Sequence, residues 1–423
     1  MGLNMVNEDL NDYMFNFIVD ICDNIGPRES GTQAEILAGD KIEEEMKSFC
    51  DKTYQEEYVS SPTAFLGGVR YGAFLVLVSI IFYWLSLLID LNIIIISNIW
   101  SIIFLVLGIL LILITVSYFI LEVMRYHESF DFLFPKKKSK NIIGEINPTD
   151  QVKNTIIFSA HHDSAYEFNL FYYLKRFGQI TINIGYLGVV IVFIMLILKF
   201  ILNLFSIFLI EFFFVMGIVF ICLTPIVFAY MFFHSYNSVL GAFDNLSGVA
   251  VVLGIGKFFA ENKSNNDVFP KNTKIFLISF AGEEAGLRGA KRFVKEHYEQ
   301  LKNDETYVIN MDSVADLNNI HFLDKEILIG AKHSPEIYSA LKKVSDELDI
   351  ETSIAALPFG ATDAAVFSKN GLKATTISGL NLVEELAPFY HTREDTPDVI
   401  DKKALGKVVD ICVNYFKQID NIQ

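Results

Sequence analysis

Two adjacent carboxylates, Glu283 and Glu284, follow an apolar run in the sequence KIFLISFAGEEAG, which begins at Lys274. The composition of the run predicts a strand, and Gly282 indicates that the strand gives way to a turn. Side chains of consecutive extended residues point in opposite directions, so one acid could bind a metal while the other handles a proton. A solvated loop is the ordinary place for such a pair, and the interpretation therefore depends on the rest of the chain.

Other side chains with metal-binding donors also come at the ends of predicted strands or in adjoining loops, namely His161, Asp244, Asp312 and His391. Taken singly, each has an ordinary structural explanation, such as a helix cap for Asp244 or a solvated loop for His391. In an extended segment His161 and Asp163 project from the same face, so Asp163 could orient the histidine as a metal ligand. The set is therefore more informative than any one member.

Together with Glu284, these side chains supply two histidines and three carboxylates. Such donors can hold a pair of divalent ions with one acid shared between them, and the pair can activate a water and bind an oxyanion. Imidazole and carboxylate without thiolate favour zinc over manganese or cobalt. The four cysteines are scattered without paired spacing, which predicts neither a disulfide framework nor a thiolate metal site.

The segments around these residues alternate between strand-like and helix-like patterns. Strands are predicted at 141–146, 155–160, 274–280, 306–311 and 373–378, and helices at 288–300, 335–348 and 402–418. This alternation predicts an α/β fold with a mixed, largely parallel central sheet flanked by helices. Ligands collect at the strand ends of such sheets, which is where the candidate residues lie. A further capped helix is predicted to begin at Thr32, with Glu35 completing a capping box.

Composition adds a membrane component. The chain has 423 residues, of which 52% are hydrophobic, and a net charge of −16, which argues against nucleic acid as a partner. Four runs are free of charged residues or nearly so: 71–89, 91–121, 177–198 and 212–233. Each is long enough to cross roughly 30 Å of hydrocarbon, so we predict two transmembrane hairpins. Helices buried in a large soluble core are the alternative interpretation.

The hairpins divide the chain into predicted segments: 1–65, 126–170 and 236–423 form one soluble domain, and 66–125 and 171–235 form the hairpins. Basic residues flank the outer ends of the hairpins, at Arg70, Arg125, Lys136, Lys137, Lys138, Lys140, Lys175 and Arg176, whereas only Lys199 is predicted to lie at a hairpin tip. By the positive-inside rule, the soluble segments of this multi-pass protein face the cytoplasm. No cleavable signal peptide is predicted at the start of the chain.

The candidate residues lie in five motifs, which occur in the order HHDS, DNLSG, GEEAG, MDS and YHTREDT. This series resembles that of the di-zinc aminopeptidases, family 28 of the metallopeptidases. GPRESG followed by a helix resembles the amino-terminal segment of that family, and PFGATDAAVF resembles its late loop with an aspartate. The resemblance covers nearly all of the chain outside the apolar runs, and five ordered motifs are far more specific than one.

The resemblance implies two zinc ions per chain. His161 and Asp312 would bind one ion, and Glu284 and His391 the other. Asp244 would bridge the two. The sequence departs from the family between the first two motifs, where the second pair of apolar runs separates His161 from Asp244. If both residues touch one metal pair, that insert must cross the membrane an even number of times.

The resemblance also implies the roles of residues that do not bind metal. Glu283 would be the general base, which takes a proton from the water and passes it to the leaving amine. Asp163 would orient His161, and Tyr390 would donate to the oxyanion. His162 occupies a variable position of its motif and is assigned no role.

These inferences predict a membrane-bound aminopeptidase whose partners are peptide substrates and the lipid bilayer. A glutaminyl cyclase-like or carboxypeptidase-like zinc enzyme on the same fold remains an alternative, and the cyclases use a single zinc. A membrane receptor or scaffold without activity is a third interpretation. The oligomeric state and the preferred amino-terminal residue are not indicated by the sequence.

Overall fold

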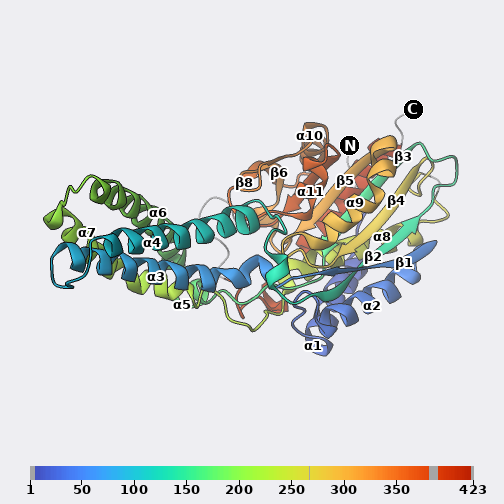
Figure 1. Ribbon diagram of the computed structural model, residues 1–423. Helices are drawn as coiled ribbons and strands as arrows, with labels where there is room; N and C mark the ends of the chain where they lie inside the picture. The colour runs from blue at the N-terminus through green and yellow to red at the C-terminus, as the bar shows by residue number, and fades with distance from the viewer. Residues whose placement is uncertain (1–4, 266, 381–388, 421–423) are drawn as a thin grey trace. The chain divides into compact units, whose positions relative to one another are not determined.

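The computed structural model describes residues 5–265, 267–380 and 389–420 (Figure 1). The chain divides into two compact units. The sheet unit comprises Met1–Pro62, Phe134–Glu167 and Asn237–Gln423, and the helix unit comprises Thr63–Leu133 and Phe168–Tyr236. The sequence predicted boundaries after residues 65, 125, 170 and 235. The outermost ends of the predicted segments 1–65 and 236–423 lie outside the described residues.

One mixed sheet forms the centre of the sheet unit, in the order β1-β2-β4-β3-β5-β9-β6-β7, with β8 paired to β6. The strands are β1 Lys52–Ser60, β2 Lys137–Ile146, β3 Asn154–His161, β4 Thr273–Phe280, β5 Glu305–Asp312, β6 His321–Glu326, β7 Ala331–Lys332, β8 Ser353–Leu357 and β9 Lys373–Ser378. Parallel pairing runs through the centre, across β4, β3, β5 and β9. The outer strands β1, β2 and β6 join by antiparallel pairing. The prediction of a mixed α/β sheet is confirmed, and its parallel part is the region that carries the candidate residues.

Helices cover both faces of this sheet (Figure 1). They are α1 Glu8–Asn24, α2 Gln33–Lys47, α8 Ser247–Glu261, α9 Arg288–Asn303, α10 Pro335–Glu347, α11 Asp363–Lys369 and α12 Lys402–Asp420. Helix α8 packs on β3, β4 and β5 and also contacts α1 and α12, so it lies at the centre of the hydrophobic core. Helices α9 and α11 contact each other and β5. A sheet covered on both faces accounts for the continuous apolar strands in the sequence.

Helix α2 begins at the predicted cap, although its hydrogen bonds differ from those of a capping box. Thr32 accepts from the backbone N–H of Glu35, with a separation of 3.4 Å. The carboxylate of Glu35 does not return to Thr32 but accepts from the backbone N–H of Gly31 at 2.8 Å and from the hydroxyl of Ser139 at 2.9 Å. The acid is therefore drawn towards the sheet, because Ser139 belongs to β2.

The helix unit consists of four long helices and the short α5 Asn169–Leu174. The long helices are α3 Ala64–Asp90, α4 Ile99–Tyr118, which continues into a π-helical turn at Phe119–Met124, α6 Arg176–Leu204 and α7 Ile210–Tyr230. They pack as a bundle in which α3 contacts α4 and α7, and α6 contacts α4 and α7. Apolar side chains also remain exposed on its surface, including those of Ile81, Leu187, Val215 and Ile221.

Within the described residues, five helical stretches are long and apolar enough to cross a membrane. Four of them are Ala64–Asp90, Ile99–Met124, Arg176–Leu204 and Ile210–Tyr230, which correspond to the four predicted runs. The fifth, Ala242–Glu261, includes α8, and its apolar window is 94% buried within the protein. Its apolar character is accounted for by its place in the core of the sheet unit.

Lys199 was predicted to lie at a hairpin tip, and this prediction was wrong. The residue lies inside α6 with its side chain buried, and its ammonium forms an ion pair with Asp90 of α3. Asn203 lies in α6 as well, so the link between α6 and α7 is shorter than predicted. A charge at the end of an apolar run predicts the end of a helix, but a paired charge can remain inside a bundle.

Candidate metal centre

The carboxyl ends of three neighbouring parallel strands bring the candidate residues together. His161 is the last residue of β3, and Asp312 is the last residue of β5. Glu283 and Glu284 follow β4, which pairs with β3 on the side opposite β5. Because the strands are parallel, all these ends meet at one edge of the sheet.

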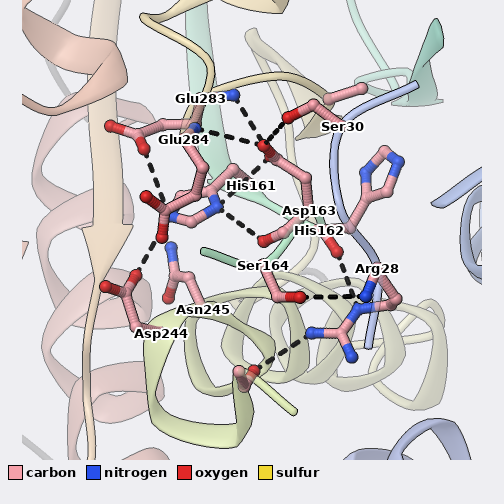
Figure 2. Close-up of polar contacts among 12 residues, drawn as sticks. Arg28, Ser30, His161, His162, Asp163, Ser164, Asp244, Asn245, Glu283 and Glu284 are labelled. Atoms are coloured by element: carbon pink, nitrogen blue, oxygen red, sulfur yellow. Dashed lines mark hydrogen bonds and ion pairs between the residues drawn. The ribbon is translucent and has the colours of Figure 1, made fainter. Parts of the chain in front are cut away.

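Asp244 lies between the two histidines. Its Oδ1 is 3.2 Å from Nε2 of His161, and its Oδ2 is 3.0 Å from Nε2 of His391. Oε1 of Glu284 is 3.1 Å from the same nitrogen of His391. Figure 2 shows that the side chains of His161, Asp244, Glu283 and Glu284 point towards one another from different elements. One carboxylate with a histidine on each oxygen is the arrangement expected of an acid shared by two ions.

Two overlapping groups of side chains have donor atoms within 4.8 Å of one another. One group contains His161, Glu283 and Asp312, and the other contains His161, Asp244 and Glu284. Oε2 of Glu283 lies 3.8 Å from Nε2 of His161, so this acid is beside the candidate ligands. The structure thus brings together every metal ligand expected from the sequence, with Glu283 next to them.

The carboxylates of this cluster are buried close to one another, which disfavours their charged forms. Burial raises the pKa of Glu283 well above its ordinary value, and the negative charge of Glu284 adds to this effect. Burial likewise raises the pKa of Glu284, and it raises the pKa of Asp312 to about 7. Oε1 of Glu284 is buried and lies beside Nε2 of His391, at 3.1 Å.

The surrounding carboxylates favour the charged, protonated forms of the two histidines. Burial by itself lowers the pKa of His161, but Glu283, Asp163 and Asp244 raise that pKa well above its ordinary value. Burial also acts to lower the pKa of His391, and the neighbouring Glu284 and Asp244 raise it to about 10. The cluster is therefore short of positive charge, which divalent cations bound to imidazole and carboxylate donors can supply. By donor type, burial and spacing, these residues fit zinc.

Asp163 holds the loop that carries both glutamates. Its Oδ1 accepts from the backbone N–H of Glu283 at 3.1 Å, and its Oδ2 accepts from the backbone N–H of Glu284 at 3.1 Å. Nδ1 of His161 lies 3.1 Å from the backbone oxygen of Asp163 and 3.5 Å from Oδ1. Asp163 was expected to orient His161, and it contacts the imidazole through both its backbone oxygen and its carboxylate. The contacts of Asp163 with the two amides were not anticipated from the sequence.

Two polar side chains fix the loop of Asp244. Asp395 accepts from the backbone N–H groups of Phe243 and Asp244, at 2.6 Å and 3.2 Å. Asn245 donates to the backbone oxygen of Met311 at 2.9 Å, and its Oδ1 accepts from the N–H of Ser313 at 3.1 Å. Asn245 therefore ties this loop to the end of β5. Its position beside Asp244 in DNLSG was the only sequence signal of this role.

Arg28 is a structural residue of the site whose role was not predicted from the sequence, although its motif GPRESG was part of the family resemblance. Its buried guanidinium donates to backbone oxygens of His162 at 2.8 Å, Leu240 at 2.7 Å and Gly241 at 3.1 Å, and to Gly26 at 2.9 Å (Figure 2). His162 follows the candidate ligand His161, and Gly241 lies three residues before the candidate ligand Asp244. One side chain thus joins the amino-terminal segment to both loops.

Tyr390 and His162 are the remaining candidates. The ring of Tyr390 stacks on that of His391, with centroids 3.9 Å apart and 17° between the planes. Burial raises the pKa of Tyr390 well above its ordinary value, so its phenol remains a neutral donor. The Nδ1 of His162 instead contacts the hydroxyl of Ser279 at 2.9 Å, and burial lowers its pKa to about 3. His162 is thus a neutral residue held by β4.

Asp363, from the late loop of the resemblance, lies buried at the start of α11. Neither of its carboxylate oxygens has a hydrogen-bond partner among the described residues. The preceding Thr362 is held by Glu326, whose carboxylate accepts from the hydroxyl at 2.6 Å and from the N–H at 3.0 Å. Burial raises the pKa of Asp363 well above its ordinary value.

Comparison with known proteins gives matches in sequence over part of the chain. Residues 227–416 match the model of Peptidase family M28. Aminopeptidase YwaD of Bacillus subtilis (strain 168) is 27% identical over 179 residues, which are 40% of this chain and 36% of that protein. A glutamate carboxypeptidase 2 homolog of Caenorhabditis briggsae is 25% identical over 178 residues, which are 38% of this chain and 23% of that protein. The chain therefore spans well under half of the length of these curated relatives.

Solved structures match over nearly the whole chain. BSAP, a zinc aminopeptidase from Bacillus subtilis, gives a TM-score of 0.55 at 14% identity, covering 97% of this chain and 95% of that chain. A glutaminyl cyclase of Bacteroides thetaiotaomicron, bound to N-acetylhistamine, gives 0.54 at 15% identity, covering 98% of each chain. At such identities the likeness is one of fold, and it confirms the predicted fold class. Residues 227–416, which match the model of Peptidase family M28, contain all the candidate ligands except His161.

Proposed function

We propose that the protein is a membrane-bound zinc aminopeptidase, which hydrolyses amino-terminal residues from peptides. The observation that carries this proposal is the position of Asp244, with one carboxylate oxygen near His161 and the other near His391. Glu283 lies at the edge of the same cluster, where a base is needed. The family match, and the relatives that are named as aminopeptidases, support the same activity.

Two zinc ions per chain would use all five ligands. His161 and Asp312 would hold one ion, Glu284 and His391 the other, and Asp244 would contribute one oxygen to each. Zinc bound in this way lowers the pKa of water and polarises a carbonyl group. The two donor groups, which share His161, support a site with more candidate ligands than a single ion needs.

The side chains of the protein would then move one proton and position the peptide. The carboxylate of Glu283 accepts a proton from the attacking water and passes it to the nitrogen of the leaving amine. Tyr390, whose phenol stays neutral, donates a hydrogen bond to the oxygen of the scissile carbonyl as negative charge develops there. Asp163 keeps Glu283 and Glu284 in place through their backbone N–H groups.

Replacement of the base tests this assignment. Glu283→Gln should bind metal as the wild type does and hydrolyse a peptide about 100- to 10,000-fold more slowly, because an amide cannot accept the proton. Glu299→Gln, the same change at an exposed position of α9, is the matched control and should keep full activity. Hydrolysis by the Glu283→Gln protein at the rate of the control would exclude Glu283 as the base.

Substrate preference separates the aminopeptidase from its alternatives. Purified protein should cleave peptides with a free amino terminus but not the same peptides after acetylation, and a chelator should abolish cleavage. Cleavage from the carboxyl end would favour a carboxypeptidase-like enzyme. Release of ammonia from an amino-terminal glutamine, with about one zinc per chain, would favour a cyclase, the enzyme that two structural neighbours are named as. Metal binding without any turnover would favour a receptor or scaffold.

For the helix unit we propose that its four long apolar helices cross the bilayer as two hairpins. The exposed apolar side chains of these helices support contact with lipid. The basic residues at the outer ends of the hairpins support a cytoplasmic position for the sheet unit. A cysteine introduced at Asn92, between α3 and α4, should react with an impermeant thiol reagent on intact cells. Protection of that cysteine would reverse the orientation.

A further inference from the structure

We propose that Ser30 is a positioning residue of the metal centre, which acts through Asp163 on Glu283 and Glu284. This inference rests on the proposed function, and it adds a residue from the amino-terminal segment to the machinery. The hydroxyl of Ser30 donates to Oδ2 of Asp163 at 2.6 Å, across 133 positions of sequence (Figure 2). Ser30 is 3% exposed and Asp163 is 0% exposed, so water does not replace this contact.

The carboxylate of Asp163 holds the backbone of both glutamates. Its two carboxylate oxygens accept from the backbone N–H groups of consecutive residues, so a rotation of this carboxylate shifts both amides together. Glu283 is the proposed base, and Glu284 is a proposed ligand. The rotation is opposed by the hydroxyl of Ser30 on one oxygen and by the ring of His161 near the other. A buried carboxylate that accepts several hydrogen bonds is fixed and kept ionised by them.

The segment that carries Ser30 is itself anchored beside Asp163. The backbone N–H of Arg28 donates to the hydroxyl of Ser164 at 2.9 Å, and the N–H of Ser164 donates to the backbone oxygen of Arg28 at 3.0 Å. The guanidinium of Arg28 then binds the backbone oxygens of His162 and Gly241. Ser30 is therefore presented to Asp163 by a rigid turn, and its hydroxyl is the only side-chain donor to Asp163 Oδ2 among the residues that the structure describes.

Removal of the hydroxyl should disturb the centre without disturbing the fold. Hydrogen bonds to the residues that hold metal ligands in place typically contribute about 10- to 100-fold to metal affinity or activity. Ser30→Ala should therefore bind zinc more weakly by about this factor, as measured by calorimetry on the metal-free protein in detergent. Its kcat should fall while KM changes little, because the acids are displaced and the peptide contacts are not. The visible absorption spectrum of the cobalt-loaded protein should shift.

A matched control distinguishes positioning from a general loss of packing. Ser345 of α10 is also buried, and its hydroxyl contacts the backbone oxygen of Lys342 at 2.7 Å and the hydroxyl of Thr352 at 2.6 Å. Ser345→Ala likewise removes the hydrogen bonds of a buried hydroxyl, but away from the centre. It should leave zinc affinity, the cobalt spectrum and kcat at wild-type values, even if its melting temperature falls as far as that of Ser30→Ala.

A double-mutant cycle with Asp163→Ala decides whether Ser30 acts through Asp163. If it does, Ser30→Ala should change zinc affinity by less than about 2-fold in the Asp163→Ala background, because there is no carboxylate left to hold. Multiplicative effects of the two substitutions, or wild-type zinc affinity and spectrum in Ser30→Ala, would overturn the proposal. Zinc affinity is measured without peptide, so the double-mutant cycle can be read even if the wild-type protein cleaves no peptide. That outcome would refute the aminopeptidase activity but not the role of Ser30.

Discussion

At the scale of single residues, Glu35 has an ordinary sequence signature and an unusual environment. Its side chain is buried, with Oε2 bound to Gly31 and Ser139, while Oε1 has no hydrogen-bond partner among the described residues. Burial, followed by the negative charge of Asp163, raises the pKa of Glu35 from 4.5 to about 8. The carboxyl group is therefore neutral at neutral pH, one helical turn from the segment that holds Ser30.

This raised pKa predicts a pH-dependent stability. The folded protein keeps a proton that the unfolded chain releases above pH 4.5, so the contribution of Glu35 is fully present below pH 4.5 and is lost as the pH rises through about 8. Between those values the melting temperature of the wild type should fall relative to that of Glu35→Gln, whose amide does not titrate. Thermal unfolding in detergent at a series of pH values measures this difference.

The control is Glu44→Gln, at an exposed position of the same helix. Its melting temperature should follow that of the wild type at every pH. A difference between the wild type and Glu35→Gln that stays constant across the pH series would contradict the assigned burial of the Glu35 carboxyl.

The sequence predicted the candidate ligands better than the residues that hold them. His161 and Asp312 each follow an apolar strand, and the parallel arrangement of those strands was enough to bring their ends together. Ser30 and Asp163 meet only because Arg28 anchors a distant segment beside Ser164, and no local periodicity records such a contact. Hydrogen bonds between remote loops depend on tertiary packing, whereas strand ends follow from local pattern.

At the scale of elements, the same distinction explains the strands that were missed. Strand β1, KTYQEEYVS, is largely polar and half-exposed, because it is at the edge of the sheet and pairs only with β2. An edge strand needs little apolar surface, so it lacks the signal that identified β3 and β5. The apolar helices were predicted readily, since each forms a long uninterrupted run, but the end of α6 was placed too early, before Lys199 and Asn203.

Lys199 forms part of a buried polar cluster that joins three helices of the bundle. Besides its ion pair with Asp90 of α3, its ammonium donates to the hydroxyl of Ser86 at 2.9 Å. Asn203 of α6 donates to Asp90 at 3.1 Å and to the hydroxyl of Ser101 of α4 at 3.0 Å. The cluster connects the first hairpin to the second with hydrogen bonds in a region that is otherwise apolar.

Removal of one partner of this ion pair should destabilise the helix unit strongly. Lys199→Met leaves the carboxylate of Asp90 buried without its cation, which should cost about 3–5 kcal/mol and lower the melting temperature in detergent. The double variant Asp90→Leu with Lys199→Met should recover much of this loss, because no charge is left unpaired. Lys295→Met, at an exposed position of α9, is the control. A Lys199→Met protein as stable as this control would contradict the burial of the pair.

At the scale of the whole molecule, each insertion of the helix unit begins and ends at adjacent points of the sheet unit. The hydroxyl of Ser61 donates to the backbone oxygen of Phe134 at 3.3 Å, on either side of the first insertion. The backbone N–H of Glu167 donates to the oxygen of Asn237 at 2.9 Å, on either side of the second. This closure is what the proposed membrane hairpins require, since a hairpin that crosses the bilayer twice returns to the side from which it left.

Because both insertion points are closed and the core of the sheet unit is built from its own residues, we expect the sheet unit to fold alone. Replacement of 63–133 and of 168–236 by short glycine and serine linkers should give a protein that is monodisperse in gel filtration without detergent. Its zinc affinity should match that of the full chain, because His161, Asp244, Glu284, Asp312 and His391 all lie in the sheet unit. The same shortened protein with Asp244→Ala should stay folded and lose that affinity. Aggregation of both shortened proteins would show that the sheet unit does not fold alone. A shortened protein that folds but lacks zinc affinity would show that the five residues named above are not sufficient to bind zinc.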